Sequence, residues 1–222
     1  MSERESLQPL SVSQRAAMEE ATANYQARLT GAAASLLVQR GLDEKTVAMF
    51  RVGVVGDPLP GHERFKGWLS IPYLDRNGEA LSMRFRCIAE HNHRDFGHGK
   101  YMSMFEEPSR VFNIRAIHEA GDTLHICEGE FDAMVLTRIG LPSIAIPGAS
   151  AWSNHHRRMI AGFSKVYVWG DPDQAGAEFV QRVCRASRAA RGVRLRDGDV
   201  TDTFIAGGAD ALLALIEKEP TA

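Results

Sequence analysis

The sequence predicts an α/β protein, in which a Rossmann-like, mostly parallel sheet with helices on both faces follows a small mixed α+β subdomain. After about residue 118, short apolar runs alternate with helical patterns, which is typical of a parallel sheet covered on both faces. Earlier in the chain, the Asn77-Gly78 turn joins two alternating segments and indicates a β-hairpin. We therefore expect a flexible leader over residues 1–20, a first unit over 21–117 and a second over 118–222.

The composition limits the class of protein. The chain has 222 residues, of which 44% are hydrophobic, so one or two packed domains are expected. Its net charge of −2 excludes a uniformly basic nucleic-acid-binding protein. The three cysteines, Cys87, Cys127 and Cys184, are far apart and form no CxxC pair, so we expect neither a disulfide framework nor a structural zinc site. The sequence has no signal-peptide core and no long apolar span, so we expect a cytoplasmic protein without a membrane partner.

The first unit is expected to begin with helices. Ser11 or Ser13 is suited to cap a helix that runs toward Arg28. An apolar helical segment over residues 32–40 ends at a glycine, and a second short helix over 43–50 has acidic residues in its first turn.

A hairpin follows these helices. Its strands are expected over residues 68–73 and 80–87, on either side of the Asn-Gly turn. The alternation of the second strand places Ser82, Arg84 and Arg86 on one face. Arg84 and Arg86, with Lys100 and Tyr101 further along, offer charge and hydrogen bonds to a nucleotide or a template. The alternative interpretation is a solvated strand face with local ion pairs.

The second unit alternates strands and helices. Ligands in such folds bind beyond the carboxyl ends of the strands, and Glu128, Asp171 and Asp199 all follow expected strands. The expected strands cover residues 124–127, 143–146, 166–169 and 193–196. The expected helices cover residues 131–139, 152–161, 175–190 and 209–218.

Acidic residues at these strand ends indicate a metal site. Glu128 and Asp132 open one expected helix, and Asp171 and Asp173 open another. Grouped carboxylates repel one another unless a cation lies among them, and oxygen ligands suit Mg²⁺ or Mn²⁺. Asp173 alone is equally explained as a helix N-cap, with Asp171 as a turn former. The combination of two such clusters favours metal-assisted phosphoryl chemistry.

These two clusters resemble the TOPRIM domain. The family carries Glu-Gly-x-x-Asp-Ala and Asp-x-Asp-x-Ala-Gly elements, and this chain has Glu128-Gly129-Glu130-Phe131-Asp132-Ala133 and Asp171-Pro172-Asp173-Gln174-Ala175-Gly176. A third acidic pair, Asp199 and Asp202, is similar to a later acidic element of primases.

The first half of the chain narrows the resemblance to the catalytic core of DnaG-type bacterial and phage primases, over nearly the whole chain from about Tyr25. Five segments follow in the order of that family: Gly41 to Phe50, Ile71 to Gly78, Arg84-Phe85-Arg86, Gly99-Lys100-Tyr101 and Val111-Phe112-Asn113.

The resemblance implies DNA-templated synthesis of RNA primers in a bacterial or phage-infected cell. The substrates would be ribonucleoside triphosphates and a single-stranded DNA template. The implied catalytic residues are Glu128, Asp132, Asp171 and Asp173. The implied ligands of Mg²⁺ or Mn²⁺ are Glu128, Asp171 and Asp173, with Asp199 and Asp202 as further candidates. The implied nucleotide- or template-binding residues are Arg84, Arg86, Lys100 and Tyr101.

The chain lacks the zinc-ribbon cysteines and the helicase part that accompany many members of that family. We therefore expect a phage-like core that works with a separate helicase or zinc-ribbon protein. Two other classes stay open, namely a TOPRIM nuclease that activates water with the same carboxylates and a non-catalytic nucleic-acid-binding subunit of a replication complex. His91, His93 and His98 suggest a metal site, but no acidic or cysteine partner spacing supports it, so a polar loop is expected.

Overall fold

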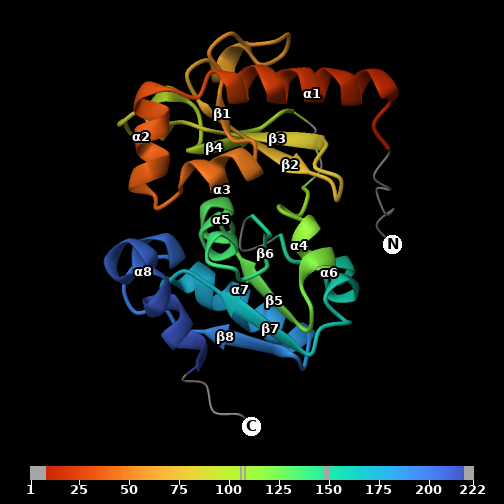
Figure 1. Cartoon of the computed structure of the whole chain (residues 1–222), viewed down its shortest axis with the longest axis vertical. Helices are drawn as coiled ribbons and strands as arrows, with labels where there is room; N and C mark the ends of the chain where they lie inside the picture. The colour runs from red at the N-terminus through yellow and green to blue at the C-terminus, as the bar shows by residue number, and fades with distance from the viewer. Residues whose placement is uncertain (1–8, 106, 108, 148–150, 218–222) are drawn as a thin grey trace. The chain divides into compact units, whose positions relative to one another are not determined.

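The computed structural model describes residues 9–217, apart from residues 106, 108 and 148–150 (Figure 1). The α-helices are α1 Val12–Ala27, α2 Gly31–Gln39, α3 Glu44–Met49, α4 Arg115–Glu119, α5 Glu130–Arg138, α6 Asn154–Met159, α7 Gln174–Ala186 and α8 Val200–Glu217. The strands are β1 Gly53–Val54, β2 Leu69–Leu74, β3 Ala80–Arg86, β4 Tyr101–Ser103, β5 Thr123–Cys127, β6 Ser143–Ala145, β7 Lys165–Trp169 and β8 Ala190–Val193. Two 3₁₀-helices cover Glu63–Phe65 and His93–Phe96.

The described chain separates into two compact units. The first comprises Met1–Ala33 and Phe50–Ser109, and the second comprises Ala34–Met49 and Arg110–Ala222. The second unit is therefore discontinuous in sequence, and α3 belongs to it. Helix α1 begins inside the range that we assigned to the leader, whose residues 1–8 lie outside the described part of the chain.

The first unit is an antiparallel sheet with the strand order β1-β2-β3-β4. Helix α1, which begins at the N-cap Ser11, contacts β1, β2 and β3. Its core joins Tyr25 of α1 to Phe85 of β3 and to Phe65. Gly53 is required in β1 because a Cβ atom there would lie 2.3 Å from the backbone carbon of Tyr25. The close contact at Gly53 thus sets the position of α1 on the sheet of the first unit.

The second unit is a parallel sheet with the strand order β6-β5-β7-β8. Alternate residues of its central strands, such as Ile126 and Val168, pack with Phe179 of α7 and Ile160 after α6 in one hydrophobic core. Helix α5 contacts β5 and β6, and α8 contacts α5 (Figure 1). Because neighbouring parallel strands β5 and β7 end together at the pair Cys127 and Trp169, the residues that follow them start from adjacent points of the sheet.

The predicted fold class is confirmed, as are the hairpin and the strand–helix alternation of the second unit. Two details of that alternation were wrong. Strand β8 covers Ala190–Val193 rather than residues 193–196, because α7 ends earlier than its helical pattern indicated. The last helix begins at Val200 and kinks at Gly208, where φ is 68°, and residue 218 of the expected helix lies outside the described range.

None of the helices in the described residues is both long enough and apolar enough to span a bilayer.

Candidate active site

Glu128 and Asp171 are brought together at the carboxyl ends of β5 and β7. Glu128 comes directly after Cys127, and Asp171 is two residues after Trp169. Burial and the nearby charge of Asp171 raise the pKa of Glu128 to about 7. Burial, followed by the charges of Asp199 and Asp173, also raises the pKa of Asp171. The two residues that the sequence singled out therefore share one acidic centre.

Glu128 has an oxygen that the described protein residues leave without a partner. Its Oε1 atom is buried, and no hydrogen bond to it is present in the described part of the chain. A buried acceptor without a partner is costly, and a carboxylate more so. A hard divalent cation between carboxylates would remove this cost and lower the repulsion from Asp171. The donor set, which consists of carboxylate oxygens, fits Mg²⁺ or Mn²⁺.

Asp173 is both a helix N-cap and a member of the acidic centre, the two roles that its sequence allowed. It is the N-cap of α7, since its Oδ1 atom accepts a hydrogen bond of 2.8 Å from the backbone N–H of Gly176. It also lies close enough to Glu128 and Asp171 for its charge to raise the pKa of both. Its carboxylate is exposed, so the cap leaves the other oxygen accessible.

Asp132 is placed differently from the other acids. Its side chain is buried, and its Oδ1 atom accepts hydrogen bonds from the backbone N–H (3.0 Å) and the hydroxyl (2.7 Å) of Thr201. Burial, followed by the charge of Asp199, raises its pKa to about 8. Asp132 thus attaches the start of α8 to α5.

Asp199 and Asp202 form the turn that begins α8. The Oδ1 atom of Asp199 accepts a hydrogen bond of 2.7 Å from the N–H of Asp202, and the Oδ2 atom of Asp202 accepts one of 3.3 Å from the N–H of Asp199. A guanidinium nitrogen of Arg40 lies 4.0 Å from an oxygen of each carboxylate. Sequence reasoning missed Arg40, because no local spacing connects the segment after α2 with α8.

Two glycines of the acidic motifs are required for steric reasons. A Cβ atom at Gly129 would lie 2.7 Å from Oδ2 of Asp132, and one at Gly176 would lie 2.2 Å from the carbonyl oxygen of Asp171. Any side chain at either position would displace an acidic residue of the centre. The glycines therefore set the positions of the carboxylates.

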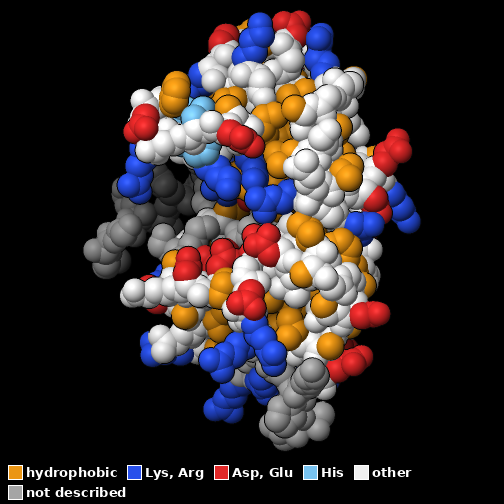
Figure 2. All heavy atoms as spheres, turned by 90° about the vertical axis from the view of Figure 1, so that its left-hand side faces the viewer, with side chains coloured by type: hydrophobic (Ala, Val, Ile, Leu, Met, Phe, Trp, Pro, Cys, Tyr) orange, Lys and Arg blue, Asp and Glu red, His pale blue; other side chains and the backbone are white. Residues whose placement is uncertain are grey.

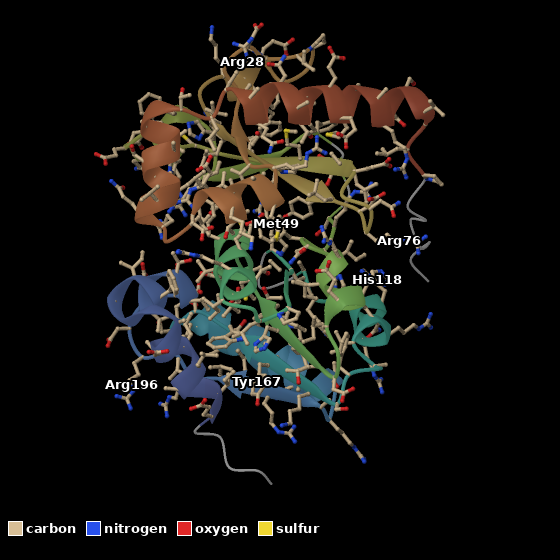
Figure 3. All side chains as sticks on the ribbon, in the orientation of Figure 1. Arg28, Met49, Arg76, His118, Tyr167 and Arg196 are labelled. Carbon is tan, nitrogen blue, oxygen red and sulfur yellow. The ribbon has the colours of Figure 1, made fainter. Side chains whose placement is uncertain are left out.

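A cleft of ≈ 950 Å³ opens beyond the carboxyl ends of β7 and β8. Asp171 and Asp173 line it together with Arg194 and Arg196, which follow β8 and are exposed. Arg196 is labelled in Figure 3. The cleft thus offers acidic groups for a cation beside guanidinium groups for an anion. Figure 2 shows a group of Asp and Glu side chains on the surface of one face.

In the first unit, two of the predicted basic residues lie over one aromatic ring. The guanidinium carbons of Arg84 and Arg86 lie 4.9 Å and 5.1 Å from the centre of the Tyr101 ring. Arg86 is buried and donates a hydrogen bond to the Tyr101 hydroxyl, whereas Lys100 is exposed. Arg84, Arg86 and Tyr101 therefore form one basic cluster, and the exposed Lys100 directly precedes Tyr101 in the chain.

Comparison with known protein families gives a match over the segment that contains both acidic motifs. Residues 125–200 match the family model described as Toprim-like. The Gene 57 protein of Mycobacterium phage D29 is 32% identical over 157 residues, which cover 68% of this chain and 99% of that protein. The DNA primase of Clostridium acetobutylicum is 23% identical over 170 residues, which cover 71% of this chain but 28% of that primase.

A solved structure shares the fold. The RNA polymerase domain of the Mycobacterium tuberculosis primase DnaG, in complex with a double-stranded DNA oligomer with a 6-nucleotide overhang, superposes with a TM-score of 0.74 at 19% identity. The match covers 94% of this chain and 81% of that one.

Proposed function

We propose that this chain, which belongs to the family of the phage D29 Gene 57 protein, is a DnaG-type primase catalytic core with a TOPRIM domain and synthesises RNA primers on single-stranded DNA. Two of its relatives are a DNA primase and the RNA polymerase domain of a primase, the latter solved with DNA. The chain spans about a quarter of the former, 28% of its length, so the proposal concerns polymerisation alone.

The buried, unpartnered Oε1 atom of Glu128 beside Asp171 is the observation that carries the proposal. A protein that only bound nucleic acid would have no use for carboxylates held at a cost next to one another, since phosphates repel them. A nucleotidyltransferase has such a use, because the reaction develops negative charge on phosphate oxygens that a bound cation neutralises.

The reaction proposed is the attack of a 3′-hydroxyl oxygen on the α-phosphorus of a ribonucleoside triphosphate. A new P–O bond forms, the bond from the α-phosphorus to the oxygen that bridges to the β-phosphorus breaks and releases pyrophosphate, and the hydroxyl proton passes to water. Glu128, Asp171 and Asp173 would hold Mg²⁺ or Mn²⁺, which polarises the phosphate and stabilises the leaving pyrophosphate when bound. Asp132 keeps α8, and with it Asp199 and Asp202, next to these ligands. Arg194 and Arg196 would bind phosphate oxygens in the cleft.

For the first unit we propose that Arg84, Arg86, Lys100 and Tyr101 bind the nucleotide or the template backbone. The support is the gathering of two guanidinium groups at one aromatic ring and the exposure of Lys100 beside it. Guanidinium groups held in this way lose little conformational freedom when they bind phosphate.

The proposed reaction is tested by incubating the full chain with single-stranded DNA, labelled ribonucleoside triphosphates and Mg²⁺ or Mn²⁺. The proposal requires labelled RNA that depends on both the template and the cation, with release of pyrophosphate. Labelled product that forms without template would contradict it, and cleavage of the DNA without synthesis would indicate a nuclease. A separate helicase or zinc-ribbon protein stays a prediction, which an increase in primer initiation on its addition would support.

A further inference from the structure

The segment between β3 and β4 brings a cysteine and three histidines together. One ligand atom from each of Cys87, His91, His93 and His98 lies within 4.8 Å of every other. The histidines were expected to form only a polar loop, because no cysteine spacing suggested a metal site. That interpretation missed Cys87, which directly follows β3 and is buried.

The spacing of these atoms is close to that of a zinc site. The Sγ atom of Cys87 lies 3.7 Å from Nε2 of His91. Tetrahedral Zn²⁺ with ordinary Zn–S and Zn–N bond lengths separates sulfur and nitrogen ligands by about 3.6 Å. The four ligand atoms lie within 4.8 Å of one another, which is wider than the separation of about 3.6 Å around a bound Zn²⁺ ion. Binding of the ion would therefore draw some of the ligand atoms inward by about 1 Å.

A second observation points to a ligand at this place. Nδ1 of His93 is buried, and it has no hydrogen-bond partner among the residues that the structure describes. Nδ1 of His98 lies 3.0 Å from the carbonyl oxygen of Gly99, and since a carbonyl only accepts, the ring carries its proton on Nδ1. The lone pair of His98 is therefore on Nε2, as in metal-binding histidines that a carbonyl orients.

The backbone holds the segment in the shape that this grouping needs. The N–H of Cys87 donates to the carbonyl of Lys100 at 2.9 Å, which closes the base of the loop. The N–H of His98 donates to the carbonyl of His93 at 3.1 Å, and Gly97 between them has a φ of 69°. The side chains of His91, His93 and His98 are partly exposed. Figure 2 shows a pale blue group of histidine atoms on the surface.

We propose that Cys87, His91, His93 and His98 bind one Zn²⁺ ion. Four protein ligands leave no open position, so the site is structural rather than catalytic. Thiolate and imidazole ligands favour zinc over Mg²⁺, whereas the acidic centre of the second unit offers oxygen ligands alone. The two sites therefore select different metals.

The zinc site would fix the part of the first unit that carries the basic cluster. Lys100 and Tyr101 follow His98 by two and three residues, and the Tyr101 ring contacts Arg84 and Arg86. Loss of the ion would make the segment between β3 and β4 less ordered, and Lys100 would then be held less firmly in place. This consequence for template binding rests on the proposed function, whereas the metal site itself does not.

Metal analysis of the untagged full chain after dialysis tests the site. The wild type should contain about one zinc per chain, and Cys87→Ser and His98→Ala should each lose most of it. Cys184→Ser is the matched cysteine control, and Glu128→Gln controls for the acidic centre. Both should keep the wild-type content. Zinc that Cys87→Ser retains, or that Glu128→Gln loses, would overturn the assignment.

Two measurements on the wild type remain informative if a variant fails to fold. A zinc chelator should lower the melting temperature by at least ~3 °C, and one equivalent of Zn²⁺ should restore it. Replacement by Co²⁺ should give the absorption of a tetrahedral thiolate complex. Absence of both effects would refute the site. If zinc binds as expected but no RNA is made, the proposed function fails and the zinc site stands.

Discussion

Asp132 on α5 and Thr201 on α8 are 69 residues apart in the sequence and are joined by two hydrogen bonds to a single carboxylate oxygen. The contact sets where α8 begins, and therefore where Asp199 and Asp202 lie relative to Glu128 and Asp171. Because the Asp132 carboxyl is buried and the charge of Asp199 acts on it, its pKa is raised to about 8, and we expect this arrangement to respond to pH and to cations.

The first prediction concerns pH. The pKa values of Asp132 (about 8) and Glu128 (about 7) lie above the ordinary values of 3.8 and 4.5. The folded state therefore binds more protons than the unfolded state between about pH 4 and pH 8, and stability falls as the pH rises through this window. Melting curves without added divalent cations should show this fall, and it should be smaller for Glu128→Gln. A slope unchanged by that substitution would contradict the raised pKa.

The second prediction concerns the cation at the acidic centre. Mn²⁺ should raise the melting temperature of the wild type, because it binds the folded carboxylates and relieves their repulsion. The double variant Asp171→Asn/Asp173→Asn should lose most of this increase. Asparagine is also a good N-cap, so α7 should remain intact in that variant.

The matched control for this experiment is Asp210→Asn. Asp210 is an exposed acid of α8 in the same unit, so its variant should respond to Mn²⁺ as the wild type does. An equal increase for the double variant and the control would refute the assignment of Asp171 and Asp173 as metal ligands.

The third prediction concerns the glycine of the second acidic motif. Gly176→Ala should lower the free energy of unfolding by about 1–3 kcal/mol and displace Asp171, because its Cβ atom would lie 2.2 Å from the Asp171 carbonyl oxygen. Gly162→Ala is the control, since nothing lies within 4 Å of its Cβ position, and should change stability by less than about 0.5 kcal/mol. Denaturant unfolding measures both, and similar values for the two variants would be incompatible with the close approach.

The fourth prediction separates the roles of the two units. Arg84→Ala and Lys100→Ala should weaken binding to single-stranded DNA or nucleotide roughly tenfold each, because each loses a charged hydrogen bond to phosphate. For Lys100→Ala, the slope of log affinity against log salt should decrease by about 0.7. Both variants should keep the stabilisation by Mn²⁺.

Arg76→Ala is the control for the fourth prediction, because Arg76 is an exposed arginine in the hairpin turn of the same unit (Figure 3). Binding isotherms at several salt concentrations compare the three variants. If Lys100→Ala removed the Mn²⁺ response while the protein stayed folded, the assignment of separate roles would fail.

The features that could be read from the sequence are local in the chain. The Asn77-Gly78 turn lies between β2 and β3, and the acidic motifs follow the apolar runs of β5 and β7, as predicted. Each of these depends on a pattern of a few neighbouring residues. The motif glycines likewise lie next to the acids that they position.

The features that were missed depend on contacts between distant segments. Arg40 reaches Asp199 and Asp202 only because residues 34–49 pack with the second unit, where Asp43 forms an ion pair with Arg138 at 3.0 Å. Cys87 lies next to the histidines because β3 and β4 pair as antiparallel strands, which brings the two ends of the segment between them together. No spacing rule for a single segment contains this information.

The most direct test of the central claim compares RNA synthesis by the wild type, Asp171→Asn/Asp173→Asn and Asp210→Asn on the same single-stranded template, with DNA cleavage followed in parallel. If Asp171 and Asp173 hold the cation for nucleotidyl transfer, the wild type and Asp210→Asn should make primers at similar rates. The double variant should lose at least about 100-fold in rate, as expected for the loss of a main electrostatic contribution. Equal synthesis by all three proteins, or cleavage of the template without synthesis by the wild type, would contradict the account.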